Sequence, residues 1–316
     1  MNNARSAALT ALLHVDVNEG YSNIVLDKTL SAFSLDQRDK ALVSAIFYGV
    51  LERRITLDYI IGQFSKTSVR KMSAQVLEIL RMGVYQILYL EKIPKSAAVN
   101  ESVNLAKENE AVKASGFINA VLRALLRNID HIQMPDSEKE PLLYLSVKYS
   151  CPEWLIALWQ EAYGKESTIG LLESAFHKPP VFARVNNTAI SEEDLIQKLN
   201  SEGVKANAIT WIDNAIELQQ TGAISQSTCF QDGLFHIQDL SSQLCCFLLN
   251  PISGLRIIDV CSAPGGKAFT IAEIMENKGE LLALDKYKGK VNLIHQGAQR
   301  LKLNIIQSAV RDASNG

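Results

Sequence analysis

The sequence predicts a multidomain protein in which an all-α bundle precedes a small α/β domain and then part of an open, parallel α/β domain. Three observations predict this order. Apolar residues recur at helical spacing through residues 1–130, strand and helix patterns alternate over residues 146–230, and beyond residue 231 an apolar strand runs into a glycine-rich turn and a helix. The chain has 316 residues, which is too long for one typical core and suits two or three domains.

Composition indicates a soluble globular protein. Hydrophobic residues make up 47% of the chain and charged residues 21%. No apolar run reaches the roughly 18 residues that are needed to span a bilayer. Met1–Arg5 lead into an amphipathic helix rather than into a signal-peptide core. We therefore expect a cytoplasmic protein that does not associate with a membrane.

The five cysteines follow no metal-binding or disulfide pattern. None lies in a C-x-x-C motif, and none has a histidine at ligand spacing, so the sequence predicts free thiols in a reducing compartment and no metal site. Cys245 and Cys246 fall in an apolar helix and are expected in the core.

Charge is distributed unevenly along the chain, although the net charge is only −2. Residues 1–130 hold 16 Lys and Arg against 13 Asp and Glu, whereas the remainder holds 16 against 21. A mildly basic first part is compatible with RNA binding, although most of these charges also fit the solvated faces of helices.

Residues 1–130 carry the apolar stripes of several amphipathic helices with short connections, which predicts an orthogonal helical bundle. One stripe at 3.6-residue spacing consists of Leu42, Val43, Ile46, Phe47 and Val50. Pro94 suits the first turn of a later helix. The polar and acidic residues 131–145 are predicted to form a linker.

Residues 146–230 predict an α-β-α-β-β order, which is similar to that of ferredoxin-like RNA-binding folds. A helix that follows Pro152 carries Trp154 and Trp159, both expected in the core, and a second helix is expected over residues 167–177. The strand 181–185 precedes a helix that Ser191 caps. Short strands are expected near residues 204–209 and 215–218.

The most informative segment is the Rossmann-like element at residues 255–275. An apolar strand ends in Asp259-Val260-Cys261-Ser262-Ala263-Pro264-Gly265-Gly266-Lys267, and a helix begins near Lys267. Such a small-residue turn lets a ligand approach the backbone, and the N–H groups of the helix point toward it. The turn is neither a G-x-G-x-x-G nor a P-loop motif, which disfavours NAD and nucleoside triphosphates. Many turns of this kind bind nothing.

Two further strands end in acids that suit a nucleoside site. The strand 279–285 ends in Asp285, about 20 residues beyond the turn, where such folds place a carboxylate on the ribose hydroxyls. Asp285 can equally cap the helix over residues 286–301. A third strand at residues 304–309 precedes Asp312, which taken alone is an ordinary loop acid.

The glycine-rich turn closely resembles the cofactor loop of the RNA cytosine-5 methyltransferases, which bind S-adenosyl-L-methionine. The resemblance implies that Asp285 binds the ribose, that Asp312 bonds the adenine amine, and that Gln238 and Asp239 lie at the methionine end, where Asp239 can also cap the helix 240–249. The implied loop residues are Cys261, Ser262, Ala263, Pro264, Gly265, Gly266 and Lys267. Within residues 146–230, Tyr149, Pro152, Trp154, Arg184 and Asn186 match the same family.

Arg184 has two open roles in that pattern. Its guanidinium can meet an RNA phosphate or the substrate base, or it can serve as a structural salt-bridge partner.

Residues 1–130 are similar to the NusB family of RNA-binding antitermination factors. The resemblance rests on Phe47-Tyr48-Gly49-Val50, Ala97-Ala98-Val99-Asn100-Glu101 and Phe117-Ile118-Asn119-Ala120-Val121-Leu122-Arg123. We expect Asn100, Glu101, Asn119 and Arg123 to make hydrogen bonds between helices rather than to contact RNA. The candidates for RNA contact are Arg5, Lys40 and Lys113.

The three parts together resemble the ribosomal RNA small-subunit methyltransferase B (Sun or Fmu) family, which methylates C5 of a cytosine in 16S ribosomal RNA. The family's nucleophilic cysteine lies in a Thr-Cys motif, after an Asp-Ala-Pro-Cys motif, and neither motif occurs in these 316 residues. No catalytic residue is therefore assigned, and Cys261 is placed in the binding turn.

We accordingly expect a truncated chain that performs parts of binding but not methyl transfer, with open strand edges and exposed apolar surface. The alternative is an RNA-binding, ribosome-assembly or antitermination-type factor with a vestigial cofactor loop. Cofactor binding discriminates between these two readings.

Overall fold

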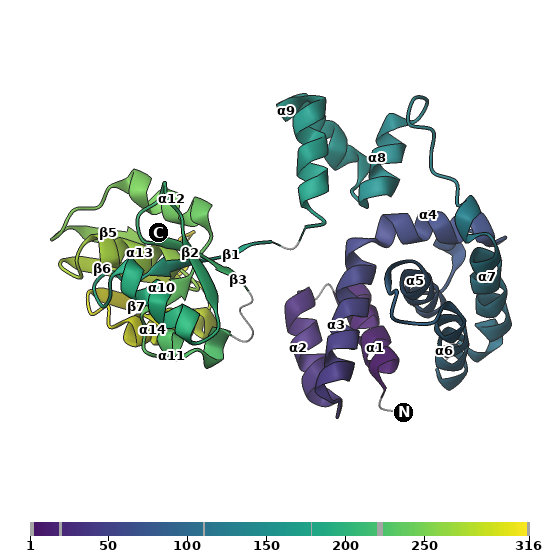
Figure 1. Ribbon diagram of the computed structural model, residues 1–316, viewed down its shortest axis with the longest axis horizontal. Helices are drawn as coiled ribbons and strands as arrows, with labels where there is room; N and C mark the ends of the chain where they lie inside the picture. The colour runs from purple at the N-terminus through teal and green to yellow at the C-terminus, as the bar shows by residue number, and fades with distance from the viewer. Residues whose placement is uncertain (1–2, 19–20, 110, 178, 220–223, 315–316) are drawn as a thin grey trace. The chain divides into compact units, whose positions relative to one another are not determined.

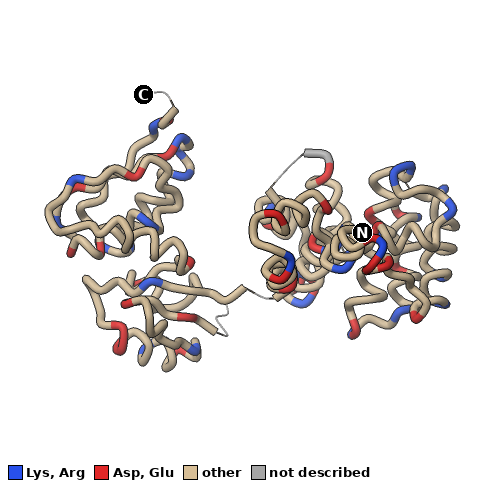
Figure 2. The backbone as a smooth tube through the Cα atoms, turned by 90° about the horizontal axis from the view of Figure 1, so that it is seen from above, with Lys and Arg blue, Asp and Glu red and all other residues tan. Residues whose placement is uncertain are grey.

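The computed structural model describes residues 3–18, 21–109, 111–177, 179–219 and 224–314. The chain divides into two compact units, residues 1–177 and residues 178–316, and each is described by itself (Figure 1). Acidic and basic residues are interspersed along both units (Figure 2). Within the described residues, no helix is long and apolar enough to cross a membrane.

The first unit begins with a bundle in which a central helix is surrounded by its neighbours (Figure 1). Helix α5 (Ala74–Tyr89) is this centre, because it packs against α1, α3, α4, α6 and α7. The other helices are α1 (Ala4–Asn18), α2 (Ser22–Ala32), α3 (Gln37–Glu52), α4 (Arg54–Phe64), α6 (Lys95–Glu108) and α7 (Ser115–Arg127), with short 3-10 turns η1 (Val69–Lys71), η2 (Val112–Ala114) and η3 (Ile129–His131). The predicted all-α bundle is confirmed.

Two further helices complete the first unit. Helix α8 (Pro141–Tyr149) begins inside the segment expected to be a linker, and it packs on α4, where the Thr56 hydroxyl donates to the Val147 carbonyl at 2.6 Å. Helix α9 (Glu153–Ser174) is interrupted at Gly164, which has a φ of 80°, so the two expected helices lie end to end with a break between them.

The two tryptophans of α9 differ from their predicted burial. Trp159 packs against the α8–α9 apolar cluster, but Trp154 is 68% exposed, so its expected place in the core is wrong. Helical periodicity identifies an apolar position, but only the neighbouring elements decide whether that position is covered.

The second unit opens with a four-stranded antiparallel sheet in the order β2-β3-β1-β4. Its strands are β1 (Val181–Val185), β2 (Lys205–Ala208), β3 (Ala215–Gln219) and β4 (Phe235–Ile237), with the helices α10 (Glu192–Ser201) and α11 (Thr228–Gln231) and the 3-10 turn η4 (Ile224–Gln226). Ser191 caps α10 through the Asp194 N–H, as the sequence predicts. Leu195 and Leu199 of α10 pack on Ala183 and Val185 of β1 to form one core.

The rest of the unit is a parallel three-stranded sheet in the order β5-β6-β7, which confirms the predicted Rossmann-like region. Its elements are α12 (Leu240–Leu249), β5 (Arg256–Asp259), α13 (Gly266–Ile274), β6 (Glu280–Asp285), α14 (Lys288–Leu301) and β7 (Ile306–Val310). Because all three strands run in the same direction, their carboxyl ends meet at one edge of the sheet.

Apolar side chains remain exposed on this sheet and on α12, as the sequence leads us to expect. Leu248 is 85% exposed, Ile258 62% and Val310 53%. The sequence predicts that both adjacent cysteines of α12 are buried. This is confirmed for Cys246 and wrong for Cys245, which is exposed. Two consecutive helical residues point in different directions, so a single apolar face cannot cover both.

Candidate functional site

The turn after β5 is fixed by hydrogen bonds to its neighbour strand and within itself. The Ser262 N–H donates to the Leu284 carbonyl of β6 at 2.9 Å, and the Gly265 N–H donates to the Ser262 carbonyl at 2.7 Å. Gly265 has a φ of 113°, and a Cβ atom placed on it would lie 2.3 Å from the Phe269 ring. Only glycine fits there without displacing that ring, and α13 begins at the next residue.

A pocket of about 220 Å³ lies at this turn, and we call it the turn pocket. One wall is the segment that joins β4 to α12, and the other is the loop that joins β5 to α13. The lining residues are Ile237, Gln238, Asp239, Ser242, Asp259, Cys261, Ser262, Ala263, Pro264, Gly266 and Lys267. The structure thus brings together Gln238, Asp239 and every proposed loop residue except Gly265, which shapes the turn from behind.

Asp285 and Asp312 lie at the same edge of the sheet but do not line the turn pocket. The Arg311 N–H donates to the Asp285 carbonyl at 3.0 Å, which joins the two strand ends. The Asp285 carboxylate accepts from the Tyr287 N–H at 3.1 Å, so it shapes the turn that leads into α14. The Ser314 hydroxyl and Lys286, whose Nζ is 2.9 Å from Asp312, hold the pKa of the Asp312 carboxyl well below its usual range.

The turn pocket contains both unpartnered donors and carboxylates. Gln238 is 6% exposed and Ser262 5% exposed, yet the Gln238 Nε2 and the Ser262 Oγ have no hydrogen-bond partner among the described residues. The Asp239 carboxylate caps α12, and hydrogen bonds from the Ser241 hydroxyl and N–H lower its pKa. Donors beside carboxylates suit a ligand group that carries both a negative and a positive charge.

Arg184 lies behind the pocket, where its guanidinium is 1% exposed. Its Nε is 3.4 Å from Glu273 Oε2, and its Nη1 donates to the Asp213 carbonyl at 2.5 Å. Burial lowers its pKa, and the Glu273 carboxylate opposes that effect. Of the two roles that the sequence leaves open, the geometry favours the structural ion pair.

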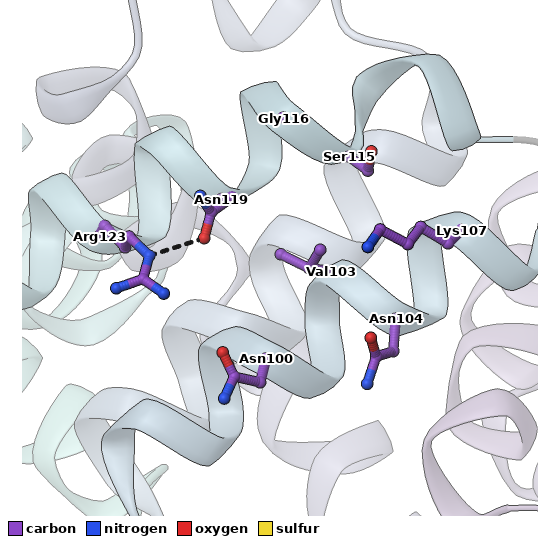
Figure 3. A pocket seen from close by; sticks show the side chains of 8 residues that line it. All are labelled: Asn100, Val103, Asn104, Lys107, Ser115, Gly116, Asn119 and Arg123. Carbon is purple, nitrogen blue, oxygen red and sulfur yellow. Dashed lines mark hydrogen bonds between the residues drawn. The ribbon is translucent and has the colours of Figure 1, made fainter.

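A second hollow lies on the first unit, between α6 and α7, and has a volume of about 550 Å³ (Figure 3). Its residues Asn100, Val103, Asn104 and Lys107 come from α6, and Ser115, Gly116, Asn119 and Arg123 come from α7. We call it the α6–α7 groove. It is lined by amides and two cations, and no acid is among its lining residues.

Of the four residues expected to make hydrogen bonds between helices, only Glu101 links two helices in the part of the chain that the structure describes, and it does so through an ion pair. Glu101 pairs with Arg5 of α1 at 3.7 Å, which joins two helices. Arg123 Nε instead donates to Asn119 of its own helix at 2.8 Å, and Asn100 points into the α6–α7 groove (Figure 3). The expectation is therefore wrong for Asn100, Asn119 and Arg123 within the described residues, because the last two bond to each other on α7 and the groove separates them from Asn100 of α6.

The proposed RNA-contact residues of the bundle lie on three different elements. Arg5 of α1 also donates to Gln86 at 2.8 Å, so both of its described contacts are structural. Lys40 is half-buried on α3, and Lys113 is exposed on η2, between α6 and α7.

Sequence reasoning missed several polar residues of the site. Asp259 and Ser242 line the turn pocket, although only the position of Asp259 at the end of β5 signals this. His236 and Thr270 lie behind the pocket, buried at 3% and 0% exposure. Their polar side chains occur on the inward faces of β4 and α13, and the sequence gives no sign of what they meet.

A helical bundle, an antiparallel α/β sheet and a parallel sheet with a pocket at its carboxyl edge define a modular α/β protein, and open parallel sheets bind their ligands at that edge. Comparison with known families agrees. Residues 2–127 match the NusB family, residues 151–225 match the Methyltr_RsmF/B-like ferredoxin-like domain, and residues 246–315 match the 16S rRNA methyltransferase RsmB/F family.

Individual relatives agree across nearly the whole chain. A probable ribosomal RNA small subunit methyltransferase B of Bacillus subtilis is 35% identical, covering 98% of this chain and 68% of the relative. A protein of the same description in Synechocystis is 32% identical, covering 97% of this chain and 69% of the relative. The crystal structure of PH0851 shares the fold, with a TM-score of 0.73 at 21% identity over 98% of this chain and 70% of that one.

The chain therefore belongs to the ribosomal RNA small subunit methyltransferase B family. It spans about two thirds of the length of these relatives.

Proposed function

We propose that this chain takes part in the methylation of 16S ribosomal RNA at C5 of a cytosine, with S-adenosyl-L-methionine as the methyl donor. Family membership supports the reaction class. The observation that carries the proposal is the turn pocket, where two buried polar atoms, the Gln238 Nε2 and the Ser262 Oγ, have no partner among the described residues and lie beside Asp239 and Asp259.

These residues fit the amino-acid end of S-adenosyl-L-methionine. That group carries a carboxylate, which takes hydrogen-bond donors, and an ammonium, which takes carboxylates. The loop backbone and Lys267 lie at the amino end of α13, where negative charge is favoured. When bound, the cofactor supplies the methyl group.

Asp285 and Asp312 would hold the nucleoside part of the cofactor. Asp285 ends β6 and Asp312 follows β7, at the edge of the parallel sheet that carries the turn pocket. Asp285 would accept hydrogen bonds from the ribose hydroxyls. Asp312 already accepts from Lys286 and Ser314, so the adenine amine would share its carboxylate with them.

Methylation at C5 needs a thiolate that adds to C6 of the cytosine. Burial raises the pKa of Cys229 and of Cys246 to about 11 and also raises that of Cys151, so these thiols stay protonated near neutral pH. Cys245 is exposed on α12, and Cys261 belongs to the binding turn. We propose that residues 1–316 bind cofactor and RNA but do not transfer the methyl group by themselves.

RNA contact by the first unit is a further part of this proposal. Lys107 and Arg123 line the α6–α7 groove without an acid, and Lys113 is exposed beside it. Cations in such a groove attract a phosphate backbone. The same observation favours the second candidate function, an RNA-binding or ribosome-assembly factor in which the turn pocket is no longer used.

Calorimetric titration of S-adenosyl-L-methionine into the 316-residue chain distinguishes the two functions. We expect saturable binding that Asp285→Ala weakens by at least tenfold. Asp232→Ala, which removes an exposed acid elsewhere in the second unit, should leave the affinity unchanged. If the unaltered chain binds no cofactor but binds RNA, the cofactor proposal is wrong and the second function stands.

A further inference from the structure

Exposed cations gather at the place where β6 leads into α14. The segment 286–290 consists of Lys286-Tyr287-Lys288-Gly289-Lys290, and all five residues are exposed. It holds three of the 13 Lys and Arg in residues 178–316, where Asp and Glu number 14. Arg311 adds a fourth exposed cation after β7, where its N–H donates to the Asp285 carbonyl at 3.0 Å. We call Lys286, Lys288, Lys290 and Arg311 the basic patch.

The lysines of the basic patch lie where the fold disfavours positive charge. The amino end of a helix carries a partial positive charge, so cations in the first turn destabilise the helix. Lys288 and Lys290 lie in the first turn of α14, and none of the described side chains caps that helix end. The like charges also repel one another. Local stability therefore does not account for the basic patch, whereas an anionic partner would offset both effects.

Neighbouring acids neutralise only part of the basic patch. Lys286 pairs with Asp312 at 2.9 Å. The other three cations of the patch form no ion pair with an acid in the part of the chain that the structure describes. The Lys290 Nζ instead lies 5.4 Å from the centre of the Tyr287 ring, and Tyr287 is 59% exposed. The surface thus combines three unpaired cations with an exposed aromatic ring.

The proposed cofactor is not the partner that these cations suit. S-adenosyl-L-methionine has no phosphate, and its sulfonium and ammonium outweigh its single carboxylate, so its net charge is positive. Cations beside Asp285, at the proposed nucleoside end, would repel it rather than hold it. The basic patch therefore fits a different and polyanionic partner that reaches the same edge of the parallel sheet.

We propose that the basic patch binds the phosphate backbone of single-stranded RNA and that the Tyr287 ring stacks on one of its bases. The inference rests on the proposed function, in which RNA is the substrate. Proteins hold single strands with cations that attract the phosphates and aromatic rings that stack on the bases. A single strand fits better than a duplex, because a base must leave its own stack before Tyr287 can contact its face.

The test measures binding of a short single-stranded RNA to the 316-residue chain at several salt concentrations, by fluorescence anisotropy. The double variant Lys288→Glu with Lys290→Glu should weaken binding about tenfold or more and lower the slope of the salt dependence by about one to two. The matched control is Lys278→Glu with Lys302→Glu. It makes the same change of charge at exposed lysines that precede β6 and β7, at the opposite edge of the same sheet, and should change neither quantity.

Tyr287 separates stacking from charge. Tyr287→Ala should weaken RNA binding about fivefold or more with an unchanged salt slope, whereas Tyr287→Phe should keep the affinity, because stacking does not need the hydroxyl. Hydrogen exchange of α14 in each variant reports whether the fold is intact. Equal RNA affinities of the two double variants overturn the inference while the proposed function stands, and an unchanged affinity in Tyr287→Ala overturns its stacking half. Failure of the unaltered chain to bind RNA overturns both the inference and the proposed function.

Discussion

Replacement of Gly265 by alanine should destabilise the second unit at the turn pocket. The new Cβ would lie 2.3 Å from the Phe269 ring, and the ring has little room to retreat. Gly297 of α14 is also so close that a Cβ there would lie 2.4 Å from the same ring. Phe269 is 5% exposed and belongs to the core between α13 and the parallel sheet.

Two effects set the magnitude. A residue other than glycine at a φ of 113° costs roughly 1–2 kcal/mol. Overpacking of a tight site adds about 1–3 kcal/mol. Together they predict a loss of about 2–5 kcal/mol in the free energy that opens α13 and β6.

Hydrogen exchange measured by mass spectrometry suits this prediction, because peptides from the second unit are read separately from those of the first. Gly266→Ala is the matched control. The nearest atoms to its Cβ would belong to Gln238, at an ordinary distance of 3.6 Å, and alanine favours a helix. Equal protection of α13 from exchange in the two variants would show that the close contact with the Phe269 ring does not control the stability of this turn.

Three other predictions concern the rest of the chain. Burial raises the pKa of Glu78 to about 7, so the folded bundle holds this proton more tightly than the unfolded chain does, and the associated stability is present below about pH 4.5 and lost as the pH rises through about 7. The free energy of unfolding of the bundle should fall by up to about 3 kcal/mol across that range, which a lower denaturant midpoint would show. In Glu78→Gln the free energy of unfolding should depend less on pH. Mass spectrometry after brief alkylation near neutral pH should show label on the two exposed cysteines and almost none on the three buried ones. The double variant Lys107→Glu with Arg123→Glu should weaken binding of a single-stranded RNA and lower the slope of its salt dependence by about two. The control Lys66→Glu should have little effect on either quantity. Equal losses of affinity in the double variant and in the control would refute a role for the α6–α7 groove.

The sequence predicts best those features that depend on neighbouring residues. The cap of α10 by Ser191 and the cap of α12 by Asp239 are both readable, because a cap needs only a side chain and an N–H two or three residues away. The small-residue turn after β5 is readable for the same reason. These local signals also place Asp285 and Asp312 at strand ends on one edge.

Contacts between distant residues are what the sequence cannot predict. Arg184 and Glu273 are 89 residues apart, and nothing local indicates that the guanidinium is buried in an ion pair instead of facing RNA. The error for Trp154 is the opposite one, because an apolar residue that we expected in the core is exposed. Its helix presents an apolar stripe that the described residues leave uncovered. The polarity and spacing of residues identify the polar and apolar faces of a helix or strand, but only the packing of the whole fold decides what each face contacts.

The turn pocket is therefore a product of both sheets of the second unit. β4 and α12 supply Gln238 and Asp239, while β5 and α13 supply the glycine-rich turn. These two walls are joined behind the pocket, where Arg184 of β1 meets Glu273 of α13 in a fully buried pair. Removal of one partner from such a pair leaves an unpaired buried charge, which costs about 3–5 kcal/mol. Arg184→Met should consequently weaken cofactor binding although Arg184 does not line the pocket, because the wall that carries Gln238 would no longer be held against the turn.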